Sequence, residues 1–122
     1  MRSKYSLTRR RRSSPTRILL DESVPVRLGA LLTGHVAITI QRQGWTSVKN
    51  GKLLALAASA GFDVLLTADK GMEYQQNLAT LPVSILVVLA KSNRIEDLAL
   101  AVRKIQSVLP GMQPRTLLKI AA

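Results

Sequence analysis

Two acidic side chains follow two short apolar runs of the sequence. Asp21 comes directly after the run 18–20, and Asp69 comes two residues after the run 64–67. If both runs are strands of one parallel sheet, their carboxyl ends lie at the same edge, where ligands bind in open α/β sheets. Two carboxylates that meet there would bind a hard cation such as Mg²⁺ or Mn²⁺, with water completing its shell. Such a cation activates water for in-line attack on a phosphodiester, so Asp21 and Asp69 are the primary metal-binding and catalytic candidates.

A structural role is the alternative for each of these side chains. Asp69 also fits a turn or cap residue, and Asp21 lies where a strand leads into a helix, a place where Asp often caps. Glu22 is a secondary metal candidate, with simple solvent exposure as the alternative. Asn50 is a secondary catalytic candidate that also fits a helix N-cap, because Gly51 and a helical pattern follow it.

Basic side chains lie close to the same predicted edge. Lys49, Lys52 and Lys70 fall in the loops and helix starts that border the two acids, and we expect them to hold RNA phosphates. A basic surface suits an acidic partner protein equally well, so charge alone does not distinguish RNA from protein.

The segments that position these residues alternate between apolar runs and helical periodicity. Strands are predicted at 18–20, 35–40, 64–67 and 83–90, with an edge strand at 115–120, and helices at 26–32, 52–60, 72–79 and 95–109. Ser23 with Pro25 predicts the start of the first helix, and Asn93 with Glu96 has the spacing of a capping box before the last. This order predicts an α/β fold with three layers, α/β/α, a mostly parallel sheet of four to five strands, and right-handed crossovers.

The composition is that of one globular domain. The 122 residues are 47% hydrophobic and contain no cysteine, which excludes disulfides, thiolate metal sites and a thiol nucleophile. The absence of cysteine fits a reducing compartment, so we expect a cytoplasmic protein. No segment approaches the ~20 apolar residues of a membrane span, so no membrane partner is expected.

The net charge of +11 is concentrated at the amino end. Residues 1–16 hold six of the 18 basic side chains and no acid, which leaves 12 basic and 7 acidic residues in 17–122. We interpret 1–16 as a basic, disordered arm and 17–122 as the domain. The arm has three interpretations: a solvated tail, upstream sequence from an early start codon, or a segment that binds phosphates.

Several blocks of the sequence resemble the short PIN-like toxins related to VapC. These are "RILLDESVP", then "GWTSVKNGKLLALAASAGFDVLLTADKGMEYQQNL", the apolar run after it and "SNRIEDL", in an order that spans residues 17–110. The resemblance implies a metal-dependent ribonuclease fold, often the toxin of a toxin–antitoxin pair, whose site acids correspond to Asp21 and Asp69. A response-regulator receiver also has acids at these two places, but it needs two more strand–helix units and a late lysine, and only residues 70–122 remain.

Two positions depart from the family pattern. Relatives often have an acid where this chain has Asn50, and another where it has Gly71. Two carboxylates in place of three or four should weaken Mg²⁺ binding and water activation.

The sequence therefore predicts a PIN-like endoribonuclease that depends on Mg²⁺ or Mn²⁺, acts on RNA and has an antitoxin protein as partner. A homodimer is a candidate assembly. The alternative is a catalytically weakened PIN-like module that binds RNA or a partner protein without cleavage. The two retained aspartates favour the nuclease, whereas Asn50 and Gly71 favour the binding module.

Overall fold

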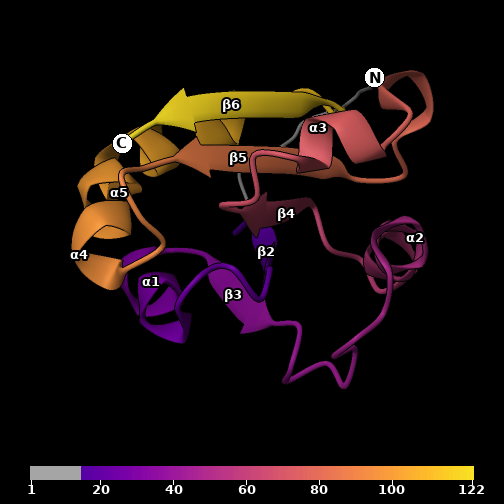
Figure 1. Ribbon diagram of the computed structural model, residues 1–122, viewed down its shortest axis with the longest axis horizontal. Helices are drawn as coiled ribbons and strands as arrows, with labels where there is room; N and C mark the ends of the chain where they lie inside the picture. Colours follow the sequence, from indigo (N-terminus) through magenta and orange to yellow (C-terminus); the bar gives the residue numbers. More distant parts are fainter. Residues whose placement is uncertain (1–14) are drawn as a thin grey trace, which may run out of the picture.

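Five parallel strands form the centre of the protein. The computed structural model describes residues 15–122, so the basic segment 1–14 lies outside the described residues. The sheet has the order β3-β2-β4-β5-β6 (Figure 1), with strands β2 (Arg17–Leu20), β3 (Val36–Thr39), β4 (Val64–Thr67), β5 (Ser84–Leu89) and β6 (Leu117–Ala121). The predicted α/β class and parallel sheet are confirmed, and β6 is the expected edge strand.

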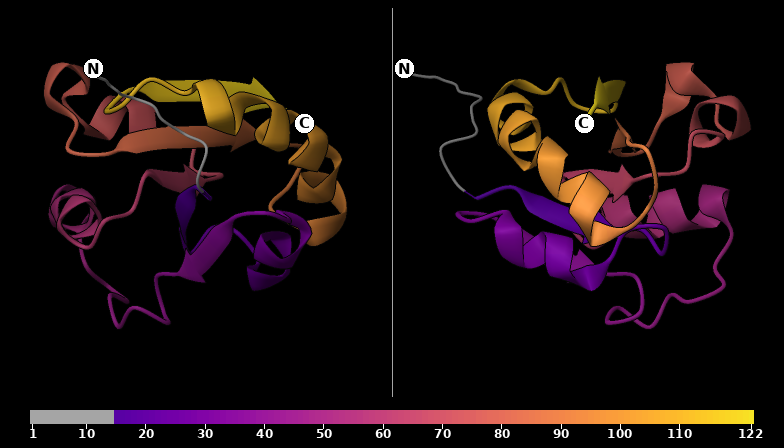
Figure 2. Two further views of the ribbon diagram at one scale, coloured as in Figure 1. Left: turned by 180° about the vertical axis from the view of Figure 1, so that it is seen from behind. Right: turned by 60° about the vertical axis from the view of Figure 1, so that its left-hand side comes forward.

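Helices cover both faces of this sheet (Figures 1 and 2). One face carries α1 (Val26–Leu31), α4 (Ile95–Leu98), η3 (Ala99–Ala101), α5 (Val102–Val108) and η4 (Leu109–Gly111). The other carries α2 (Asn50–Ser59), α3 (Met72–Gln75) and the short turn η2 (Leu78–Thr80). The three predicted layers are thus present. None of the helices in the described part of the chain is both long and apolar enough to cross a membrane.

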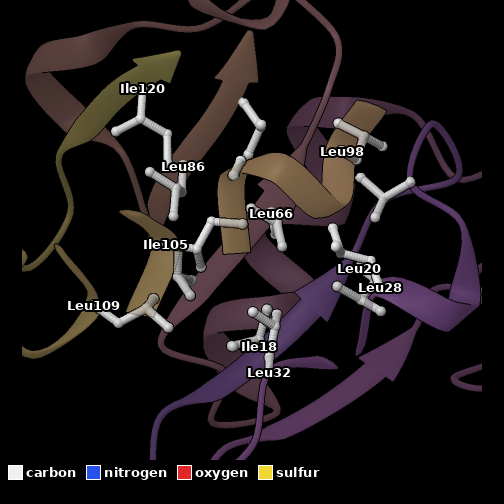
Figure 3. Close-up of a cluster of buried hydrophobic side chains, with 14 of the residues drawn as sticks. Ile18, Leu20, Leu28, Leu32, Leu66, Leu86, Leu98, Ile105, Leu109 and Ile120 are labelled. Atoms are coloured by element: carbon white, nitrogen blue, oxygen red, sulfur yellow. The ribbon is translucent and has the colours of Figure 1, made fainter. Parts of the chain in front are cut away.

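Strand side chains alternate between two separate cores. In β2 and β4, Ile18, Leu20 and Leu66 face the α1, α4 and α5 layer, where Leu28, Leu98 and Ile105 pack on them (Figure 3). Leu19 and Leu65 face the opposite layer and contact α2 and α3. Because successive strand residues point to opposite faces, Asp21 and Thr67 fall on the α2–α3 face.

The crossovers do not all share one hand. α3 leads from β4 to β5 on one face, whereas the segment from α4 to η4 leads from β5 to β6, in the same direction across the sheet, on the other face. These two connections must therefore have opposite hands, and the expectation of right-handed crossovers throughout is wrong. On the face that carries α1, which has six residues, the α4–η4 segment covers Leu86 and Val88.

The last helical segment also differs from its prediction. It is broken by the 3₁₀ turn η3, although Leu98, Ala101, Ile105 and Leu109 still face one core. The prediction of a capping box formed by Asn93 and Glu96 is wrong, because the N-cap of α4 is Arg94 and no side chain caps this helix. Instead, Oγ of Ser92 accepts a hydrogen bond from the Arg94 N–H and donates one to Asp97.

His35 connects three segments at the end of the sheet where β2 and β3 begin. Nδ1 of His35 accepts a hydrogen bond from the N–H of buried Thr16 at 3.1 Å, and its Nε2 donates to Oε1 of Gln106 at 3.0 Å. Because Nδ1 accepts, the ring proton lies on Nε2. His35 therefore connects Thr16, the residue before β2, to β3 and α5.

Candidate functional site

The two predicted acids follow strands that are direct neighbours. β2 and β4 pair in parallel, with Ile18 opposite Val64 and Leu20 opposite Leu66, and the Asp21 N–H continues this ladder to the carbonyl of Leu66 at 3.0 Å. After β2 the chain enters α1 on one face, and after β4 it enters α3 on the other. Neighbouring strands whose connections diverge in this way form a topological switch point, which is where α/β sheets bind ligands.

The carboxylate of Asp21 is held by two hydroxyl groups. Its Oδ2 accepts hydrogen bonds from Ser23 at 2.7 Å and from Thr67 at 2.9 Å. The Ser23 hydroxyl in turn accepts from the N–H of Ala68 at 3.0 Å. Among the described residues, these bonds leave the second oxygen, Oδ1, for another partner.

Thr67 connects the two acids. It is fully buried, its Oγ1 donates to Asp21, and the same oxygen accepts the N–H of Asp69 at 3.0 Å. The side chain of Asp69 is partly exposed, and its Oδ1 accepts the N–H of Gly71 at 2.8 Å. Asp69 is therefore a turn residue, as one interpretation predicted. Its Oδ2 makes no hydrogen bond within the described part of the chain, so the turn does not exclude a second role.

Asn50 lies at the edge of this group. It is the first residue of α2, and no side chain caps that helix, so the N-cap interpretation of Asn50 is wrong. Its side-chain N–H₂ instead donates a short hydrogen bond to Oε1 of Gln75 in α3. This bond joins the beginning of α2 to α3, next to the turn formed by Asp69 and Gly71.

Other acids remain outside the group. Glu22 is exposed, and the structure does not unite it with Asp21 and Asp69: residues 15–122 contain no group of three or more His, Cys, Asp or Glu that could hold a metal. Glu73 pairs with Lys119 of β6 at 2.8 Å. The hydrogen bond to Glu73 raises the pKa of Lys119. A cation at this edge would thus have two carboxylates.

The three predicted RNA-binding lysines border the group. Lys49 and Lys52 lie at the start of α2, Lys70 lies between Asp69 and α3, and all three are exposed. The hydrogen bond between Asn50 and Gln75 holds these two segments together. The lysines therefore flank the acids on the α2–α3 side.

Sequence reasoning missed Ser23, Thr67 and Gln75 as members of the site. Ser23 was predicted to cap α1, but the N-cap is Pro25 and no side chain caps this helix. Thr67 gave a usable signal, because a polar residue at the end of a buried strand needs hydrogen-bond partners. Gln75 gave none, since its contact with Asn50 depends on how α2 and α3 pack.

Comparison of the chain with protein-family models, curated proteins and solved structures found no match. The fold and the site therefore define the class: a three-layer α/β protein with two carboxylates at the switch point of a parallel sheet.

Proposed function

We propose that the protein is a PIN-like, metal-dependent endoribonuclease of the toxin type, acting on RNA in the cytoplasm. One observation carries the proposal: Asp21 and Asp69, from neighbouring strands, both bond to the buried hydroxyl of Thr67 at the switch point. The order of sequence blocks that resembles PIN-like toxins supports the same function.

The donor atoms fit a small, hard cation. Oδ1 of Asp21 and Oδ2 of Asp69 are carboxylate oxygens not engaged with other described residues, and Asn50 adds a neutral amide oxygen. Mg²⁺ is commonly held by one or two carboxylates while it keeps several waters, and Mn²⁺ accepts the same ligands. When bound, such an ion supplies an activated water and neutralises charge on the phosphodiester.

The residues of the chain have separate roles in this proposal. Asp21 and Asp69 hold the cation, and Ser23 and Thr67 fix the orientation of the Asp21 carboxylate. Lys49, Lys52 and Lys70 bind phosphates of the RNA without reading its sequence. The net charge of +11 supports both an RNA substrate and an acidic antitoxin.

The second candidate is a PIN-like module that binds RNA or a partner protein without cleavage. It is favoured by the small number of carboxylates: neutral Asn50 and Gly71 stand where relatives often have acids, and Glu22 does not join the group. Binding would then depend on the lysines and would not require a cation.

Cleavage of labelled single-stranded RNA tests the proposal. Wild type, Asp21→Asn and Asp69→Asn are compared with Mg²⁺, with Mn²⁺ and with chelator. Asp63→Asn is the matched control, because Asp63 lies at the opposite end of β4, where its carboxylate accepts the N–H of Arg17 at 2.7 Å.

We expect metal-dependent cleavage by wild type and Asp63→Asn, and its loss in the other two variants. RNA binding without cleavage under every condition would establish the binding module instead. Cleavage that survives both Asp21→Asn and Asp69→Asn would refute the site.

A further inference from the structure

The carboxamide of Gln75 and the carboxylate of Asp69 border one small space. A Cβ atom added to Gly71 would lie 3.2 Å from Nε2 of Gln75 and 3.3 Å from Oδ1 of Asp69. Both distances are shorter than an ordinary van der Waals contact. The amide group of Gln75 therefore lies directly beside the place where a side chain at residue 71 would begin.

The backbone does not require glycine at residue 71. Its φ of −78° and ψ of −10° lie in the right-handed helical region, which any residue adopts. The constraint on residue 71 is therefore the neighbouring side chains. Gln75 is exposed, and its Oε1 accepts the hydrogen bond from Asn50, which favours the position of its amide group beside Gly71.

We propose that Gln75 is a positioning residue of the metal site, in which its carboxamide occupies the space beside Asp69 that glycine at residue 71 leaves open. The inference rests on the proposed metal site. Together, Gln75 and Asn50 form a neutral amide pair beside the turn of Asp69 and Gly71. The pair joins the start of α2 to α3.

The two amide groups can hydrogen-bond to each other in two orientations, because each carries both a donor and an acceptor. With Asn50 as donor, the N–H₂ of Gln75 is the end near Asp69. If both amides reverse, Gln75 donates to Asn50 and its Oε1 takes that place. The side of the pair near Asp69 therefore presents N–H groups in one orientation and an oxygen in the other.

Binding of Mn²⁺ alone, followed by electron paramagnetic resonance of the free ion, tests the role toward a metal. Because partners outside the metal's immediate ligands typically contribute 10–100-fold to affinity, we expect Gln75→Ala to weaken Mn²⁺ binding by about tenfold. Gln75→Glu keeps the acceptor for Asn50 and adds a charge, so it should bind Mn²⁺ more tightly than wild type. Gln76→Ala, which removes the same side chain one residue later, should bind as wild type does.

A thermal-stability cycle tests the steric part without metal or RNA. Gly71→Ala is made in wild type and in Gln75→Ala. Alanine at an unstrained helical position raises Tm by a few degrees through the unfolded chain. We expect this gain in the Gln75→Ala background and a smaller gain or a loss in wild type.

The outcomes separate the two proposals. If Asp21→Asn abolishes Mn²⁺ binding but both Gln75 variants bind as wild type does, the metal site stands and the role of Gln75 is overturned. If wild type binds no Mn²⁺, the proposed metal site fails, and the role of Gln75 toward a metal fails with it. An equal effect of Gly71→Ala on Tm in both backgrounds would overturn the steric part on its own.

Discussion

At the scale of single residues, one hydroxyl group organises the site. Thr67 uses both capacities of its oxygen, since it donates to Asp21 and accepts from the backbone of Asp69. A hydroxyl can serve two partners of opposite kind in this way, whereas an ammonium group only donates and an ionised carboxylate only accepts. The orientation of Asp21 and the path of the chain at Asp69 are therefore coupled through one atom.

Thr67→Val keeps the shape of this side chain and removes the bridge. We expect it to lower the free energy of unfolding by about 1–3 kcal/mol, because the N–H of Asp69 and the carboxylate of Asp21 each lose a partner in a partly buried place. Urea unfolding measures the loss, with Thr67→Ser as the control that keeps the hydroxyl. A Val variant as stable as the Ser variant would contradict the importance of the bridge.

Residue roles were predictable where a local pattern decides them. Asp21 and Asp69 were found because each follows an apolar run, and the structure places both runs side by side. Ser23 was assigned to the wrong role because Ser-x-Pro favours a helix cap locally, whereas its hydroxyl bonds to the N–H of Ala68, 45 residues away. No pattern near Ser23 contains that contact.

At the scale of elements, strands were easier to predict than helices. β4 has the predicted bounds, and the buried strands β2 and β5 lie within one residue of theirs, because continuous apolar runs mark strands that are covered on both faces. The segment 95–109 kept its buried face but not its continuity, since helical spacing of apolar residues does not reveal a 3₁₀ turn.

The α4–η4 segment offers a test of the core. Ile105 is fully buried in α5, while Leu100 of η3 is 73% exposed. Ile105→Ala should lower the free energy of unfolding by about 2–5 kcal/mol through lost packing and a cavity. Leu100→Ala should change it by less than about 0.5 kcal/mol. Equal losses in denaturant titrations would mean that this segment does not cover the sheet as described.

The lysines at the start of α2 and after β4 make a prediction about RNA binding. Replacing Lys52 or Lys70 with Ala removes one phosphate contact, so we expect weaker binding to all sequences and a salt dependence reduced by about one unit of slope. Binding titrations at several salt concentrations measure the slope. Arg103→Ala, on the helix layer of the opposite face, is the control and should leave the slope unchanged.

At the scale of the whole molecule, the net charge can be lowered without removing any residue that the structure describes. Removing residues 1–12 takes away six basic side chains and no acid, which reduces the formal charge from +11 to +5. The bonds of Thr16 to His35 and Val36 do not involve the deleted residues.

We therefore expect the truncated chain to keep the Tm of the full chain. Its RNA affinity should fall at low ionic strength, and the difference should shrink as salt is added. Calorimetry and binding titrations of the two chains measure these effects. A lower Tm would show that the basic segment contributes to the fold, and equal affinity at low salt would rule out a role in binding RNA.

The order of the strands has a consequence for synthesis of the chain. β2 comes first in the described part of the sequence but lies between β3 and β4, and the bond from Thr67 to Asp21 spans 46 residues. During synthesis, Asp21 leaves the ribosome before Thr67, Asp69 and Gln75. The site can therefore form only after all of these residues have emerged. If the protein cleaves RNA, the machinery that makes it is not exposed to an assembled site until residue 75 has emerged.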